Sequence, residues 1–577
     1  SGITLFLSIK LFGTETTDPI FIELRNSVFP ALDKFMILHL DSLSKMISLF
    51  IGFFGFLFIL YSLAYITKKK NIISYYSYYL LTVGGAFGAV LADSLIFFIL
   101  FWGLLGLTLY KLIKGYDEES SSAAKKSLIM IGASDSILIL GIAILFKMTN
   151  SYSMSEITVP TTGALGIIAF LSLLIASLTK AGAFPVHSWI PDYAQKAPAS
   201  SSAFLPASLD KLLGIYFLAR ICMNIFQITN WATCLLLIIG SVTIIAAVMM
   251  ALVQHNYKKL LGYHAVSQVG YMVTGLALGT PLGIAGGLFH MINHALYKSG
   301  LFLTAGSVEK QTGKEELDEV GGLSKLMPLT FITALICALS ISGIPPFNGF
   351  SSKWMIYQGI IDFGNSGAGI ASKLWVVWLI MAIFGSALTL ASFIKFISGI
   401  YLGRKKKEFE KVKEVSFLMW IPQIIIAAVC VIFGVFAAKT IVPLFISPIV
   451  GKFHYIGVWK SQFVSILILV SIVVGYLIYL IGNIKNMRTS DSFLCGEKNQ
   501  EEASFGPLEF YKTISTFKFL SFFYKKAEQK WFDVYDLSKR IILRFNSVFS
   551  NAHSGFLPRY ILWLIAGMLI LMIILIF

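Results

Sequence analysis

The chain has 577 residues, of which 56% are hydrophobic and 13% charged, and its formal net charge is +16. Its mean hydropathy is +0.78. Soluble domains carry about 25% charged residues, so the composition excludes a string of globular domains and indicates a polytopic helical membrane protein. The five cysteines form no CxxC pair, and no Walker A or dinucleotide glycine motif follows a strand. We therefore expect neither a metal nor a cofactor in this chain.

In chain order, residues 1–13 are apolar but too short to span a bilayer, and the chain does not begin with Met. We expect them to be the end of a truncated helix, within an N-terminal segment 1–41 that continues as an outer loop. Fourteen later stretches approach or exceed the roughly 20 apolar residues that a span needs. They are 42–66, 76–92, 94–113, 125–147, 164–186, 203–226, 231–254, 259–280, 282–307, 328–362, 373–402, 416–441, 461–482 and 559–577. The predicted fold is all-α, with about 14–16 transmembrane helices.

The loops between these spans give a prediction of topology. Basic clusters occur at 68–70, 125–126, 258–259, 404–407 and 485–488, and the fourteen spans place all of them on one side. The positive-inside rule makes that side cytoplasmic. The net charge is therefore a topology signal, and nucleic-acid binding is a poor alternative. We expect a multi-pass protein of a prokaryotic cytoplasmic membrane.

Two spans contain helix breakers next to a lysine. Prolines 185, 191, 198 and 206 follow Lys180, and the stretch Gly343–Gly349 precedes Lys353. Broken backbone at membrane depth is tolerated where it is buried in protein or lines water, and broken helices beside charges are common at ion sites. Simple proline kinks are the alternative interpretation. We predict two inverted five-helix repeats with broken helices.

The predicted organisation is 42–93 for N-terminal helices, 94–226 for a first half-channel, 227–258 for a linking helix and 259–402 for a second half-channel. Residues 403–505 hold further helices and a cytoplasmic loop, 506–554 a lateral amphipathic helix, and 555–577 a terminal transmembrane helix. The stretch 508–554 has no Gly or Pro and shows apolar residues at helical spacing between charges. We expect one long helix from about 508 to 550, which either lies on lipid or clamps the chain and a neighbouring subunit.

Ionisable residues inside apolar spans are the strongest functional signal, because a charge at membrane depth costs several kcal/mol. His290, His294 and Lys298 are spaced i, i+4, i+8 and so share one helix face. Two histidines and a lysine on one face suit proton transfer; a metal site lacks a third ligand. His264 shares another face with Gln268 and Tyr271, which either holds water or bonds helices together. Lys180, Asp135, Lys211, Lys353 and Lys395 complete the set.

Three motifs resemble a known family. They are Thr179–Asp192 (TKAGAFPVHSWIPD), Phe289–Lys298 (FHMINHALYK) and Gly343–Phe350 (GIPPFNGF), and 257–271 fits the same pattern. The chain resembles the antiporter-like subunits of respiratory complex I, Mrp-type sodium/proton antiporters and energy-converting hydrogenases, in the large distal form with a lateral helix. The stretches 206–214, 312–322 and 352–354 are more similar to the hydrogenase-associated relatives.

The resemblance implies roles for individual residues. Lys180 is the central proton-exchanging lysine and Lys211 its neighbour on the next helix. His290, His294 and Lys298 form the central axis, Lys353 is the terminal lysine of the second half-channel, and Asp135 is the acid before the first break. Redox centres belong to a peripheral Fe–S arm elsewhere in the complex, and the other partners are neighbouring membrane subunits, lipid, and H⁺ or Na⁺.

One departure concerns the family's Phe-Trp-Glu motif, which here reads Phe101-Trp-Gly103. The glutamate that pairs with the broken-helix lysine is absent. We expect Asp135 to replace it as the partner of Lys180, directly or through water, with Asp93 a weaker candidate at a span's outer end.

The function that the resemblance implies is ion translocation in a redox-driven complex, of the energy-converting hydrogenase or a related ferredoxin-linked type. Three alternatives stay open at this point. The chain can be a distal subunit of NADH–quinone oxidoreductase, a subunit of a stand-alone Na⁺/H⁺ antiporter, or a structural subunit that has lost pumping.

Overall fold

A computed structural model describes residues 1–14, 19–23, 33, 35–66, 72–114, 118–402, 407–458, 460–482, 511–553 and 555–576. The basic clusters 68–70 and 485–488 and most of 404–407 lie outside these residues, as do Cys495 and positions 508–510. The chain divides into two units, Ser1–Ser515 and Thr516–Phe577, which are described separately below.

The first unit is built almost entirely from helices. Its N-terminal part and first broken region contain α1 (Gly2–Phe12), α2 (Ser42–Tyr65), α3 (Ile72–Leu91), α4 (Leu95–Ile113), α5 (Glu118–Thr149), α6 (Gly163–Ala181), α7 (Trp189–Lys196), α8 (Ala199–Phe204), the π-helical turn η2 (Leu205–Leu209), α9 (Asp210–Arg220) and a second π-helical turn η3 (Ile221–Ile225). Its later part contains α10 (Asn230–Leu252), α11 (Tyr257–Ala277), α12 (Pro281–Thr312), η4 (Leu323–Lys325), α13 (Pro328–Ser342), α14 (Asn348–Ser366), α15 (Ile370–Lys373), α16 (Trp375–Ile397), η5 (Ser398–Leu402), η6 (Lys407–Phe409), α17 (Phe417–Val435), η7 (Ala437–Ile441), α18 (Val442–Phe445), α19 (Ser447–Val450), α20 (Ser461–Ile481) and α21 (Lys512–Thr516).

Strands make up a very small part of the described residues. β1 (Ile20–Glu23) and β2 (Ile37–Leu40) pair antiparallel, with Ile20 opposite Leu40. β3 (Val159–Pro160) and β4 (Phe226–Gln227) form a short parallel pair between the loop before α6 and the end of η3. The all-α membrane fold predicted from composition is therefore confirmed.

Ten helical stretches among the described residues are long and apolar enough to cross a membrane. The fourteen predicted spans all coincide with helices, and four of them fall outside this group for reasons that differ from span to span. α3 is rich in tyrosine, α11 and α12 carry buried polar residues that lower their hydropathy, and α13 and α14 are the two halves of one interrupted span.

The interruptions occur where the prolines and glycines predict them. α6 ends at Gly182, with φ +80°, before a cis Phe184–Pro185 bond, and α13 ends at Gly343, with φ +79°, before a cis Pro345–Pro346 bond. A left-handed residue after a helix favours glycine, which has no β-carbon to clash. At Gly182 the packing adds a second reason, because a β-carbon there would stand 1.8 Å from the Ile190 side chain.

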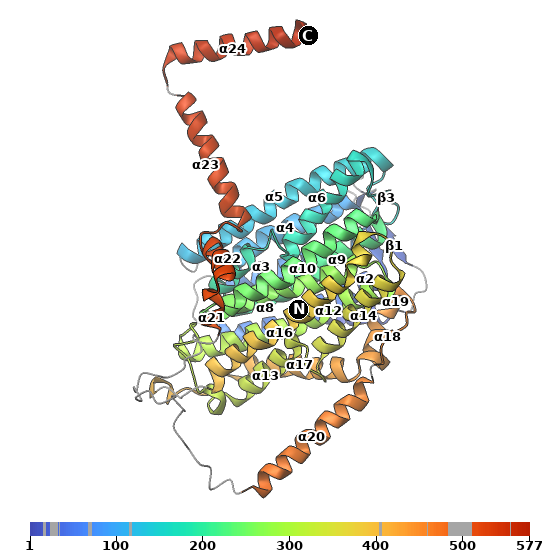
Figure 1. The fold of residues 1–577 in the computed structure, drawn as a ribbon, viewed down its shortest axis with the longest axis vertical. Coiled ribbons are helices and arrows are strands. Elements are labelled where there is room, and N and C mark those ends of the chain that lie inside the picture. The colour runs from blue at the N-terminus through green and yellow to red at the C-terminus, as the bar shows by residue number, and fades with distance from the viewer. Residues whose placement is uncertain are drawn as a thin grey trace. The chain divides into compact units, whose positions relative to one another are not determined.

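The order of elements repeats along the first unit. α4, α5, the broken pair α6–α7 and α8–α9 are followed later by α11, α12, the broken pair α13–α14 and α16, and both series end in a π-helical turn. α12 packs against α11, α13, α14 and α17, and α6 packs against α5 and α9. Figure 1 shows α5 beside α6 and α14 beside α12. Because protein surrounds α12, its residues from Leu282 to Val308 are almost all buried. The polar face of α12 therefore faces other helices.

Polar contacts join the helix ends into two groups. On one side the Tyr65 hydroxyl donates to Glu309 at 2.9 Å, and Lys258 lies 3.2 Å from the same carboxylate, which joins the ends of α2 and α12 to the start of α11. On the other side Arg220, at the end of α9, bonds Asp41, which caps the start of α2. This grouping agrees with the alternation of sides that the predicted spans require.

The second unit contains α22 (Lys518–Glu528), α23 (Val534–Ala552) and α24 (Leu557–Ile576). α22 and α23 are amphipathic, and α24 is long and apolar enough to cross a membrane. The expectation of one continuous helix from about 508 to 550 is wrong. The chain leaves the helix between Gln529 and Asp533, where Lys530 has φ +57°, and Asp533 caps the start of α23 through the Tyr535 amide. A left-handed residue and a capping side chain thus separate the two helices without Gly or Pro.

Candidate functional site

Ionisable side chains at the centre of the first unit are buried. The exposed fraction is 2% or less for Lys180, Lys211, His264, His290, His294, Lys298 and Lys353. The remaining predicted residue, Asp135, is half-buried on α5. So many buried basic groups in apolar helices need compensating partners.

Lys211 is bonded to the broken end of α6. Its ammonium donates to the Ala181 carbonyl, one of the carbonyls left free where α6 stops. A cation at a helix C-terminus is favoured by the helix dipole and satisfies an orphan acceptor. α9 approaches α6 closely here, because the Ser177 hydroxyl donates to the Gly214 carbonyl at 2.8 Å and a β-carbon on Gly214 would stand 2.5 Å from the Ala181 nitrogen.

Lys180 is one residue away from this cap, and its surroundings differ from the prediction. Its ammonium lies 5.1 Å from the Trp102 ring and has no hydrogen-bond partner among the described residues. The carboxylates in electrostatic reach are Asp210 first and Asp135 second. Asp135, the expected partner, is therefore one of two acidic neighbours of Lys180.

Asp210 was missed because it is adjacent to Lys211, and adjacent helical residues do not face each other. The useful signal was available: a carboxylate inside the apolar span 203–226 needs a cation wherever it points. Asp93, the weaker candidate, belongs elsewhere, since it lies 3.5 Å from His39 Nδ1 and accepts from the Ser153 hydroxyl. At Gly103 no other atom lies within 4 Å of the position that a β-carbon would occupy.

The middle of α12 carries the next ionisable side chains. Together with Lys180, Lys211 and Lys353 they form what we call the buried line. His294 and Lys298 have buried ring and ammonium nitrogens without hydrogen-bond partners among the described residues. His294 interacts electrostatically with Lys211, Lys298 and His290, and Lys298 interacts with Lys211. The Lys298 ammonium lies 5.8 Å from the Phe302 ring and 5.6 Å from the Phe393 ring. Aromatic faces stabilise a buried cation.

His290 and His264 are hydrogen-bonded, unlike His294. His290 Nδ1 lies 2.9 Å from the Ser352 hydroxyl, and its Nε2 lies 3.2 Å from Gln268 Oε1. His264 Nε2 lies 2.7 Å from the Ser392 hydroxyl. His264 and Gln268, predicted to share one helix face, thus contact different helices. Gln268 contacts His290 on α12, and His264 contacts Ser392 on α16.

Lys353 is the second lysine that bonds the end of a broken helix. Its ammonium donates to the Ile341 carbonyl at the end of α13 and to the Ser386 hydroxyl, both at 2.8 Å. The ammonium also lies 4.8 Å from the Tyr271 ring. Lys211 and Lys353 therefore make the same kind of contact, a lysine ammonium on a carbonyl of the last turn before a left-handed glycine.

Lys395 was singled out as a membrane-depth lysine, and the structure places it outside this line. Its ammonium donates to the carbonyls of Leu252 at 3.0 Å and Gln254 at 2.9 Å, just where α10 ends. These bonds satisfy carbonyls that a helix end leaves free. Lys395 therefore supports the fold.

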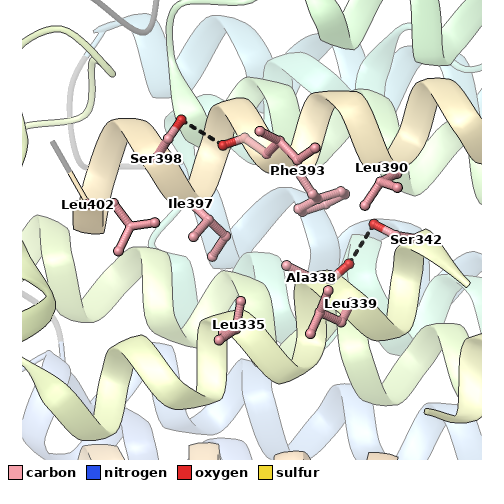
Figure 2. Close-up of a pocket in the computed structure, with 10 residues that line it drawn as sticks. Leu335, Ala338, Leu339, Ser342, Leu390, Phe393, Ile397, Ser398 and Leu402 are labelled. Carbon is pink, nitrogen blue, oxygen red and sulfur yellow. Dashed lines mark hydrogen bonds between the residues drawn. The ribbon is translucent and has the colours of Figure 1, made fainter. Parts of the chain in front are cut away.

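A small apolar cavity lies between α13 and α16, with a volume of about 160 Å³ (Figure 2). Ala338, Leu339, Leu390 and Phe393 are among the residues that line it. The ring of Phe393 also contacts His264, at 4.7 Å between ring centroids. Among the residues that the structure describes, no group of three His, Cys, Asp or Glu side chains is placed to hold a metal ion.

Comparison with known sequences decides the family. The profile described as NADH:quinone oxidoreductase/Mrp antiporter, TM, matches residues 92–389, which include the whole buried line. The chain belongs to this family. It is 34% identical over 420 residues to Na(+)/H(+) antiporter subunit A1 of Staphylococcus haemolyticus, and 33% identical over 423 residues to that of Staphylococcus aureus. Each match covers 69% of this chain, and the chain spans about half the length of these curated relatives, 52%.

Solved structures of this family share the fold. A chain of the membrane-bound sulfane sulfur reductase, an archaeal respiratory membrane complex, aligns with a TM-score of 0.80 and 25% identity, covering 99% of this chain and 94% of that chain. A chain of the Mrp complex from Dietzia sp. DQ12-45-1b aligns with a TM-score of 0.69 and 20% identity, covering 78% and 90%. A chain of respiratory complex I from Thermus thermophilus aligns with a TM-score of 0.65 and 20% identity, covering 78% and 92%.

Proposed function

We propose that this chain moves protons or sodium ions across a prokaryotic cytoplasmic membrane as the antiporter-like subunit of a larger complex. The observation that carries the proposal is the electrostatic line that runs from the half-buried Asp135 through the buried groups Lys180, Asp210, Lys211, His294 and Lys298 to His290 and Lys353. Buried charges of this number are costly to a fold, and a role in ion exchange explains why the chain carries them.

The groups of the line are of two kinds, those with hydrogen bonds and those without. Lys211 and Lys353 are held by carbonyls at helix ends, so each has a fixed position. Lys180, His294 and Lys298 have no hydrogen-bond partner among the described residues, so a gained or lost proton changes their charge without breaking a bond. We infer that the bonded lysines position the line and that the unbonded groups exchange the ion.

We further propose that the complex is redox-driven, of a hydrogenase-like or related ferredoxin-linked type. The support is coverage: the alignment with the sulfane sulfur reductase chain includes 99% of this chain, whereas those with the Mrp and complex I chains include 78%. A second candidate is an Mrp-type Na⁺/H⁺ antiporter, which the curated relatives favour. The genes next to the gene for this chain distinguish the two candidates. Genes for redox subunits with Fe–S motifs favour the redox-driven complex, and genes for further antiporter subunits favour the Na⁺/H⁺ antiporter.

Partners follow from the same proposal. Neighbouring membrane subunits bind the amphipathic helices, where Ile542, Phe545, Val548 and Phe549 of α23 each expose more than half of their surface, between 62% and 68%. A peripheral arm holds the Fe–S centres. Lipid covers the outward apolar faces of the spans.

The test is ion movement by the whole complex in proteoliposomes. Lys298→Ala and Lys180→Ala should each lower ion translocation at least about tenfold with assembly unchanged, because each removes an exchanging group from a single line. Lys325→Ala, at an exposed lysine in η4 outside the line, is the matched control. Repeating the assay without Na⁺ and then with a protonophore separates sodium from proton transport. Full translocation by both line variants would rule the proposal out.

A further inference from the structure

One buried acid, Asp210, is not among the residues to which the family resemblance gives a role. Asp210, the first residue of α9, is 1% exposed, and its Oδ2 atom has no hydrogen-bond partner among the described residues. Desolvating a carboxylate without compensation costs several kcal/mol. A residue placed in this way therefore needs a cation close by.

The backbone fixes where this carboxylate stands. α9 follows the π-helical turn η2, which contains Pro206, a residue without an amide hydrogen. π-helical turns commonly occur at functional positions. Downstream, Gly214 lets α9 lie against Ala181, and Lys211 bonds the Ala181 carbonyl. The start of α9 is thus held against the last turn of α6, where Lys180 is the penultimate residue.

Two lysines share Asp210. Its carboxylate interacts electrostatically with Lys180 and with Lys211. Lys180 in turn has Asp210 as its strongest acidic neighbour, and Lys211 has Asp210 as its acidic neighbour. The Lys180 ammonium has no hydrogen bond that would otherwise satisfy it among the described residues.

Asp135 is less well placed to be this partner. It is half-buried on α5, and its Oδ2 atom lies 3.9 Å from where a β-carbon on Gly106 would stand, in the contact between α4 and α5. Trp102 lies next to both Asp135 and the Lys180 ammonium. Partial exposure weakens the Coulomb interaction that Asp135 offers.

We propose that Asp210 is the shared counter-ion of Lys180 and Lys211, which replaces the glutamate that is absent at Gly103. The inference rests on the proposed ion translocation and assigns a residue to it. When Lys180 is protonated, the carboxylate balances its charge. When Lys180 releases its proton, the whole attraction of the carboxylate acts on Lys211, whose charge is felt by His294 and Lys298. The acid of this half-channel is thus carried by α9 instead of α4, and one carboxylate couples the half-channel to the central axis.

The test compares four variants in the reconstituted complex, with transport normalised to assembled complex. Asp210→Asn keeps the side-chain volume and removes the charge, and it should lower translocation about tenfold or more, as Lys180→Ala does. Asp210→Glu restores a carboxylate and should retain at least about a third of wild-type translocation. Asp135→Asn should have a smaller effect than Asp210→Asn. Asp362→Asn, at a half-exposed aspartate on α14, is the matched control.

The outcomes separate this inference from the proposed function. If Lys180→Ala abolishes translocation and Asp210→Asn keeps more than half of it, the inference is overturned while the function stands. If Lys180→Ala also transports normally, the function itself fails. Should Asp210→Asn reduce assembly, the Glu and Asn variants are compared per assembled complex. Equal transport by those two would mean that the charge of Asp210 has no role, and would overturn the inference.

Discussion

The ion pair between Arg220 and Asp41 offers a quantitative test of the fold. Arg220 is 4% exposed, and its guanidinium donates to both carboxylate oxygens of Asp41, at 2.6 and 2.8 Å, and to the Tyr216 hydroxyl at 3.1 Å. Asp41 also caps α2 by accepting from the Ser44 amide at 2.8 Å. One pair of side chains therefore ties the end of α9 to the start of α2.

The magnitude follows from the pKa of Asp41. Burial by itself raises the pKa of this carboxyl, but the Arg220 guanidinium together with the hydrogen bond from the Ser44 amide holds the pKa at about 2, against a usual value of 3.8. At 1.36 kcal/mol per pKa unit, this shift corresponds to about 2 kcal/mol of stability. Removing one partner of a buried pair commonly costs about 3–5 kcal/mol, so Arg220→Met should lower the free energy of unfolding by about 2–4 kcal/mol.

The assay is unfolding of the detergent-solubilised chain by SDS titration, followed by circular dichroism. The double variant Arg220→Met/Asp41→Asn should recover part of the loss, because it leaves no unpaired charge and Asn still caps a helix. Because the folded-state pKa is lowered, the contribution is fully present above about pH 4 and is lost as the pH falls through about 2. A loss below about 0.5 kcal/mol at pH 7 for Arg220→Met would refute the reasoning, since surface pairs already contribute that much.

Two further predictions separate packing from ion transport. Gly214→Ala places a β-carbon 2.5 Å from the Ala181 nitrogen, so it should push α9 away from α6. We expect the free energy of unfolding to fall by about 1–3 kcal/mol, and translocation to fall because the contact of Lys211 with α6 is disturbed. Thermal unfolding measures the first effect and proteoliposome transport the second. Unchanged values for both would contradict the close approach. Lys395→Met should destabilise the chain by about 1–3 kcal/mol, because it leaves helix-end carbonyls at α10 unsatisfied, yet transport per assembled complex should stay near wild type. Loss of transport as severe as in Lys298→Ala would place Lys395 within the line.

Much of the architecture was predictable from the sequence. Apolar runs of bilayer length located the spans, since water is excluded there and the backbone must satisfy itself within helices. Gly182 and Gly343 marked the two breaks, because a left-handed turn favours glycine. The i, i+4 spacing placed His290, His294 and Lys298 on one face, and burial of all three agrees with that pattern. The length predicted for the lateral helix was too great, because a stretch without Gly and Pro can still break, as it does at Lys530.

The sequence by itself determined that the protein is a polytopic helical membrane chain with two broken spans and an unusual set of ionisable residues. Which of those residues meet was decided only by the tertiary structure. Lys395 and Lys211 look alike in sequence, yet one bonds the end of α10 and the other joins the buried line. Asp210 is an acidic neighbour of Lys180, beside Asp135, because Gly214 lets the start of α9 lie against the last turn of α6. Coulomb interactions depend on separation and burial in space, and neither quantity is encoded in the spacing of residues along one helix.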